Sequence, residues 1–172
     1  MARLVASYRW KLTPSFPNGS LVYLSTKGAC LTMKPRITLI TLGVDDLNRA
    51  LKFYRDGLGL LTKGIVGTEF EHGVVAFFDL QNGLKLAIWG RKDLAHEANV
   101  PLGPRSATEF TLGHNVASKA EVDTVVAQAQ KAGATITDPP HEALWGGYTG
   151  SFQDPDGHVW EVAWNPDWDI AD

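Results

Sequence analysis

The 172-residue sequence has little cysteine, no long apolar run and no excess of positive charge. Its one cysteine, Cys30, excludes an internal disulfide framework and a cysteine-rich zinc module. No stretch of about 20 apolar residues is present, so the sequence predicts no membrane-spanning helix. The net charge of −3 offers no basic surface to nucleic acid or to an anionic membrane. Six Trp, seven Phe and four Tyr supply apolar surface, so we expect a folded, cytoplasmic protein.

The first 32 residues also lack Asp and Glu. They hold four basic residues, whereas residues 33–172 hold 12 basic and 19 acidic residues, a net charge of −7. Three interpretations of this N-terminal extension stay open: a targeting peptide, an appended arm, or translated upstream sequence. We favour the third, because Met33 stands just before the first regular strand and resembles a natural start.

Residues 33–90 predict a strand, a helix and two or three further strands. Residues 37–44 are apolar and β-branched, which is typical of a strand. Asp45-Asp46 provides a helix N-cap, and apolar residues at helical spacing follow up to Leu58. The later strands are expected at 60–66, 73–80 and 84–89, with a hairpin turn at Gln81-Asn82-Gly83.

The second half, residues 108–166, repeats this order after an aperiodic linker at 91–107. A strand is expected at 110–116, and Ser118 with Glu121 forms a capping box that opens a helix ending at Gly133. Strands are then expected at 135–137, 147–153 and 158–164, the last two joined by a tight turn at 154–157, and residues 167–172 form a tail. Neither half can close a core alone, so the two modules must pair, within one chain or between chains.

Several motifs carry a resemblance to a known family. They are Leu42-Gly43-Val44-Asp45-Asp46-Leu47, Leu58-Gly59-Leu60, Asp154-Pro155-Asp156-Gly157-His158 and Trp160-Glu161-Val162. Residues 36–166 resemble the vicinal oxygen chelate superfamily of glyoxalases, bleomycin-resistance proteins and extradiol dioxygenases, in an uncharacterised glyoxalase-like branch. The resemblance implies an α+β fold of two paired βαβββ modules, with the sheet curled around a cavity. It also implies a divalent metal in that cavity and a homodimer.

The metal ligands that the resemblance implies are His, Glu or Gln side chains from four strands. Counting from the motifs places these positions at Leu39, Lys85, Thr111 and Glu161. A leucine cannot bind a metal and a lysine ammonium repels a cation, so only Glu161 keeps a ligand type. We therefore expect no cofactor, and a divalent metal held by an incomplete ligand set is the alternative.

Strand alternation gives the expected walls of the cavity. Glu161 and Lys85 are the candidate catalytic residues, and a pair of Lys85 with Glu161 or Glu109 would neutralise a buried carboxylate. We favour a structural ion pair over a proton-transfer pair. The glycines between Trp145 and Tyr148 let the backbone approach a ligand. The candidate ligand-binding residues are Leu39, Thr41, Trp89, Glu109, Thr111, Trp145 and Tyr148.

Three functions remain open at this point. The first is a metal-free binding protein for a small organic ligand or toxin, supported by Leu39 and Lys85. The alternative is a metal-dependent lyase or isomerase of the glyoxalase I type, supported by Glu161 and acting on an oxygen-rich substrate. A dioxygenase-like iron site is weaker, because Thr111 removes one histidine. The expected partners are a small molecule and a second copy of the chain, without nucleic acid or membrane.

Overall fold

The computed structural model describes residues 36–107, 110–168 and 170. Contacts divide the chain into residues 1–36 and Ile37–Asp172, and the second unit is the one considered below. The predicted N-terminal extension with Cys30, the start at Met33 and the candidate wall residue Glu109 lie outside the described residues.

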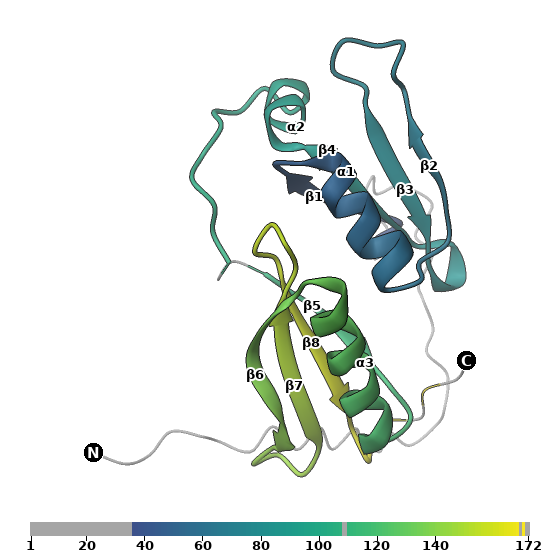
Figure 1. The fold of residues 1–172 in the computed structure, drawn as a ribbon, viewed down its shortest axis with the longest axis vertical. Coiled ribbons are helices and arrows are strands. Elements are labelled where there is room, and N and C mark those ends of the chain that lie inside the picture. Colours follow the sequence, from purple (N-terminus) through teal and green to yellow (C-terminus); the bar gives the residue numbers. More distant parts are fainter. Residues whose placement is uncertain (1–35, 108–109, 169, 171–172) are drawn as a thin grey trace, which may run out of the picture. The chain divides into compact units, whose positions relative to one another are not determined.

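The first module is a four-stranded mixed sheet with one helix across it (Figure 1). The strands lie in the order β1-β4-β3-β2, and β1 runs parallel to β4. The helix begins at Asp46, whose carboxylate accepts a hydrogen bond from the Arg49 amide at 3.0 Å. The elements are β1 (Leu39–Val44), α1 (Leu47–Leu51), η1 (Lys52–Gly57), β2 (Thr62–Val66), β3 (Val75–Asp79), η2 (Gln81–Gly83) and β4 (Lys85–Gly90).

The second module repeats this arrangement, with the strand order β5-β8-β7-β6. The predicted capping box is confirmed, because Ser118 Oγ accepts from the Glu121 amide at 3.2 Å and the Glu121 carboxylate accepts from the Ala117 amide at 2.9 Å. Gly133 ends the helix with φ +108°, which favours glycine. The elements are β5 (Thr111–Asn115), α3 (Lys119–Ala132), β6 (Thr135–Glu142), β7 (Tyr148–Gln153) and β8 (Val159–Trp164).

The first helix lies where the sequence predicts it but is π-helical in its second part, η1, after Leu51, and two other local predictions were wrong. The linker contains a helix, α2 (Arg91–Glu97), which is stabilised by packing of Arg91 and Leu94 over Gly43 rather than by an apolar stripe. Strand β6 continues to Glu142 through two prolines, which an edge strand with register shifts tolerates.

One apolar core joins the two modules. Phe53 and Tyr54 of η1 reach the second module, where their rings lie 6.5 Å from Phe152 and 6.1 Å from Trp160. Gly57 packs against Ala132 of α3 so closely that an added Cβ would lie 2.4 Å from the alanine Cβ. The predicted pairing of two βαβββ modules is therefore confirmed within a single chain.

Each sheet has one face under helices and one that we call its open face. Leu42, Phe78 and Leu86 are buried on the helix-covered face of the first sheet, and Val162 on that of the second. Within the described residues, no hydrogen-bonded ladder joins the two sheets. None of the described helices is long and apolar enough to cross a membrane.

Candidate functional site

The open face of the first sheet carries most of the residues that alternation assigns to the cavity. Leu39 lies beside Lys85 in the parallel β1–β4 register, and Thr41 lies beside Ala87. Phe77 and Asp79 of β3 pair with Ala87 and Lys85 and share this face. Leu39 is 46% exposed and Phe77 is 38% exposed, so an apolar surface is open to ligands beside the lysine.

The ammonium group of Lys85 is paired with Asp79 on the neighbouring strand β3. This pair replaces the expected contact with Glu161, which stands on β8 in the other sheet and is not bonded to Lys85. The ion pair also lowers the pKa of Asp79 below its ordinary value. Register decides the partner, because Asp79 lies directly opposite Lys85 in an antiparallel ladder.

The other end of this open face is covered. Gly43 lies under Arg91 and Leu94 of α2, whose side-chain atoms lie 3.0 and 3.4 Å from an added Cβ. Trp89 is half-buried, and its indole N–H donates to the carbonyl of His72 at 2.9 Å. Leu39 and Lys85 therefore stand at the accessible end, whereas Trp89 stands at the covered end.

The open face of the second sheet carries Glu161. Gly113 lies opposite Glu161 in the β5–β8 register, Thr111 lies opposite Val159, and Ser151 lies opposite Glu161 on the other side. The hydroxyl of Thr149 lies within donating distance of the Glu161 carboxylate, at 3.3 Å. Among the described residues, no cation lies within 4.0 Å of Glu161. This half-buried carboxylate is therefore an acceptor without a charged partner.

Tyr148, a candidate ligand-binding residue, lies on the helix-covered face of the second sheet and not on its open face. It pairs with Trp164, shares its face with buried Phe152, and donates its hydroxyl to Asp123 of α3 at 3.0 Å. The ammonium of Lys119 lies 5.9 Å from its ring centre. Tyr148 thus links α3 to the second sheet. Side chains alternate between the two faces along β7, so Tyr148 points to the same face as Phe152.

Trp145 lies at the hairpin between β6 and β7 and is 53% exposed. Its ring fills the space above Gly147, where an added Cβ would lie 1.8 Å from a ring carbon. Gly147 therefore makes room for this indole on its own hairpin, whereas Gly146 has φ +98°, a backbone conformation that favours glycine. His114 of β5 pairs with Val162 on the helix-covered face, and burial lowers its pKa.

The donor set does not fit the metal site of the family. Leu39 and Lys85 stand side by side at two of the implied ligand positions, and Thr111 stands at a third. Within the described ranges, no group of three or more His, Cys, Asp and Glu side chains could hold a metal ion. Glu161 is the one implied position with a side chain that divalent metals prefer.

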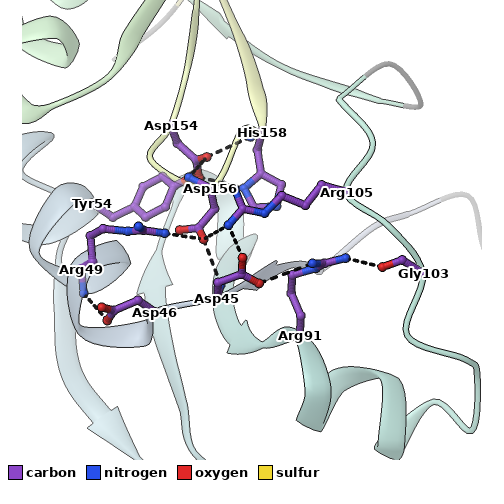
Figure 2. A network of polar contacts seen from close by, with 10 residues as sticks. All are labelled: Asp45, Asp46, Arg49, Tyr54, Arg91, Gly103, Arg105, Asp154, Asp156 and His158. Atoms are coloured by element: carbon purple, nitrogen blue, oxygen red, sulfur yellow. Dashed lines mark hydrogen bonds and ion pairs between the residues drawn. The ribbon is translucent and has the colours of Figure 1, made fainter.

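A buried polar network, which we call the inter-module network, joins the turn before β8 to the first module (Figure 2). Asp154 accepts the hydroxyl proton of Tyr54 at 2.6 Å and pairs with the His158 ring at 2.8 Å. Asp156 accepts from the Asp45 amide at 2.9 Å and from the Arg49 guanidinium at 2.8 Å. The side chains of Asp154 and Asp156 are 0% and 1% exposed, so their carboxylates are fully enclosed.

The linker contributes two arginines to the same region. Arg105 pairs with Asp45 and lies 3.8 Å from Asp156, whereas Arg91 lies 3.4 Å from Asp45 and donates to the carbonyl of Gly103 at 2.6 Å. Figure 2 shows these groups converging from α1, α2, the linker and the turn before β8. The linker is thereby fastened to both modules.

This environment shifts two pKa values in opposite directions. Burial and the neighbouring Asp154 charge raise the pKa of Tyr54 well above its ordinary value. Burial alone would raise the pKa of Asp154, but hydrogen bonds from His158 and Tyr54 outweigh it and lower that pKa. Asp154 therefore stays ionised and Tyr54 stays protonated at neutral pH.

Sequence reasoning recognised the Asp-Pro-Asp-Gly segment as a turn but not as a source of buried charge. Within the turn, the amides of Asp156 and His158 each donate to the Asp154 carboxylate at 2.9 Å, and these local hydrogen bonds explain why the sequence has the residues of a tight turn. The contacts with Tyr54 and Arg49 span 100 and 107 residues and leave no local signal. Asp79 is not part of any sequence motif either, so the sequence did not indicate that it would pair with Lys85.

The family model of the glyoxalase/bleomycin resistance protein/dioxygenase superfamily matches residues 36–162. The chain belongs to this superfamily. A solved structure of a glyoxalase-related enzyme from Fulvimarina pelagi is 31% identical, with 80% of this chain and 94% of that chain covered and a TM-score of 0.68. No curated protein matches this superfamily member at a significant level.

Two further solved structures share the fold. One is a glyoxalase/bleomycin resistance protein/dioxygenase from Nocardioides, with 21% identity, 83% and 93% of the two chains covered, and a TM-score of 0.63. The other is a lactoylglutathione lyase from Agrobacterium tumefaciens, with 23% identity, 81% and 100% covered, and a TM-score of 0.59. At these identities the likeness concerns the fold alone.

Proposed function

We propose that this superfamily member binds a small organic ligand on its open faces and does so without a metal cofactor. The observation that carries the proposal is the pairing of Leu39 with Lys85 at two positions where the family places metal ligands. Leucine offers apolar contact and lysine a positive charge, so this surface suits an organic molecule better than a cation.

The accessible end of the first open face contains a groove of about 330 Å³. Its lining combines the apolar side chains of Val66 and Phe77 with the ion pair of Lys85 and Asp79. A volume of this size accommodates a small, partly aromatic molecule. The lysine and aspartate offer a donor and an acceptor that orient such a ligand.

A homodimer forms the second part of the proposal. Ile37 and Leu39 lie at or beside the start of β1, an edge strand, and are 74% and 46% exposed. A second copy would cover this apolar edge and bring the Glu161 face of one chain toward the groove of the other. In that arrangement Glu161 and Lys85 would act on one ligand.

Elemental analysis tests the metal-free part of the proposal. The protein is incubated with Zn²⁺, Ni²⁺, Mn²⁺ and Fe²⁺, desalted and assayed for bound metal, and we expect far less than one ion per chain. About one ion per chain, lost in Glu161→Gln, would contradict the proposal. It would favour the alternative, a metal-dependent lyase or isomerase of the glyoxalase I type.

Calorimetry tests the ligand surface. The protein is titrated with small aromatic compounds, bleomycin included, in the presence of a chelator. We expect a saturable ligand whose Kd rises about ten-fold in Lys85→Met and in Phe77→Ser, because each change removes one contact of about 1.4 kcal/mol. Tyr148→Phe is the matched control, since Tyr148 faces α3 and its change should leave the Kd unaltered.

Sedimentation equilibrium tests the homodimer. We expect twice the mass of one chain, and dissociation in the variant Leu39→Glu, which places a charge on the exposed edge. A single-chain mass at all concentrations would remove the dimer from the proposal and leave the groove of one chain as the site.

A further inference from the structure

A cavity of about 650 Å³ lies between α2, the linker and the turn before β8, apart from the groove beside Lys85. Three of its apolar wall residues, Val100, Leu102 and Phe110, are 54%, 51% and 45% exposed. A cluster of exposed apolar side chains around one cavity is typical of a binding site. The volume lies within the range of small-molecule sites.

His158 supplies a directed polar atom to this cavity. Its Nδ1 lies 2.8 Å from the carboxylate of Asp154, so Nδ1–H is the donor and Nε2 points away from that carboxylate. The ring lines the cavity, and its side chain is 13% exposed. Nε2 has no hydrogen-bond partner among the residues that the structure describes. An imidazole fixed by a buried carboxylate is oriented before any ligand arrives.

Arg105 supplies a second donor group at the cavity wall. Its guanidinium is 48% exposed, and its contacts with Asp45 and Asp156 both use one terminal nitrogen. A guanidinium has five N–H groups, so donors remain for a ligand. Asp156 also lines the cavity, but its side chain is only 1% exposed and its Oδ1 is paired with Arg49 at 2.8 Å.

We propose that this cavity is a second ligand site, independent of the proposed function, and that it takes a small amphipathic carboxylate. The carboxylate accepts hydrogen bonds from the His158 imidazolium and from Arg105, and the apolar part contacts Leu94, Val100, Leu102 and Phe110. The imidazolium is paired with Asp154, and the ligand would share Arg105 with Asp45 and Asp156.

Protonation of His158 is part of this binding. The charged groups that face its ring are Asp154 and Asp156 on its own turn and Arg105 on the linker, with the Tyr54 hydroxyl beyond Asp154. A neutral imidazole offers Nε2 as an acceptor, and an imidazolium offers it as a donor. A carboxylate ligand therefore needs the form of His158 in which Nε2–H is a donor.

An NMR titration with 4-phenylbutyrate tests the site, with 4-phenylbutan-1-ol as the uncharged control ligand. We expect saturable shifts of the amides of Leu102, Phe110 and His158, and a Kd for the alcohol that is higher by about ten-fold or more. Equal affinity for the acid and the alcohol, or no saturable shift near these residues, would overturn the proposal.

Variants separate this site from the open faces. Arg105→Gln and His158→Asn should each weaken 4-phenylbutyrate binding by about ten-fold, whereas Lys131→Gln, which removes an exposed cation of α3, should not. Loss of binding in Lys85→Met with full binding in Arg105→Gln would place the acid in the open-face groove and overturn the proposal.

Discussion

Asp154 accepts more side-chain hydrogen bonds than any other residue of the turn before β8. Its two oxygens accept four hydrogen bonds, from the Asp156 and His158 amides, the Tyr54 hydroxyl and the His158 ring. A buried carboxylate with this many donors is stable only while it is ionised. The residue therefore links the fold to the acidity of the solution.

Asp154→Asn should lower the free energy of unfolding by about 3 kcal/mol at pH 7, because buried donors lose a charged acceptor. The folded-state pKa of Asp154 is depressed, so its contribution is complete above its unfolded value and is lost as pH falls through the folded value. Urea unfolding between about pH 5 and pH 2 should therefore show a steeper loss of stability in wild type than in the variant.

Asp56→Asn is the matched control, since Asp56 forms an exposed pair with Arg55. Its effect on stability should be much smaller than that of Asp154→Asn, because an exposed ion pair contributes little. An equal pH slope in wild type and Asp154→Asn would show that Asp154 is not the group that senses acid.

At the level of elements, the contact between η1 and α3 sets how the modules fit. Gly57 has room for no side chain, because Ala132 already occupies the space. The π-helical turn brings the Gly57 carbonyl to Gln128, whose amide donates to it at 2.9 Å. The widened helix thus matches the surface of the second module.

Gly57→Ala should destabilise the protein by about 2 kcal/mol through overpacking against α3. Ala132→Gly alone should cost about 1 kcal/mol, as glycine does inside a helix. The double variant should be more stable than the sum of the two changes predicts, since the clash is removed. Thermal unfolding of the four proteins measures this coupling, and additive effects would contradict the contact.

The order of the elements and the faces of the strands could be predicted from the sequence, because they depend on local periodicity. The capping box at Ser118 and the positions of Leu39 and Lys85 on one face are examples. The Lys85–Asp79 pair, the orientation of Tyr148 and the helix α2 could not be predicted so well. The Lys85–Asp79 pair depends on the register between β3 and β4, which the sequence does not specify. The orientation of Tyr148 depends on which face of the sheet the helix covers, and α2 depends on a tertiary contact with Gly43.

At the scale of the whole molecule, the single core makes the modules dependent on each other. Phe53 and Tyr54 are 2% and 0% exposed, and both lose their cover if the second module is absent. Burying an aromatic side chain stabilises a protein by about 2 kcal/mol, so each isolated module would lose the stabilisation from several buried side chains. A four-stranded sheet with one helix would then have too small a core.

Fragments 33–98 and 99–172, divided at the exposed linker residue Asn99, test this dependence. Each fragment alone should lack a cooperative thermal transition, and an equimolar mixture should regain one with the circular dichroism of the intact chain. Cooperative melting of either fragment by itself would show that a module has its own stable core. Fragment 99–172 with Asp154→Asn should reassemble more weakly.

The inter-module network also bears on how a duplicated gene can diverge. The turn between β3 and β4 has the same place in the first module as the turn before β8 in the second, yet its sequence, Leu80-Gln81-Asn82-Gly83-Leu84, contains no carboxylate. One copy therefore supplies the acids, and the other supplies Tyr54 and Arg49. The halves are no longer interchangeable: two second halves joined together would enclose acids without donors. Each half now constrains which mutations the other can accept.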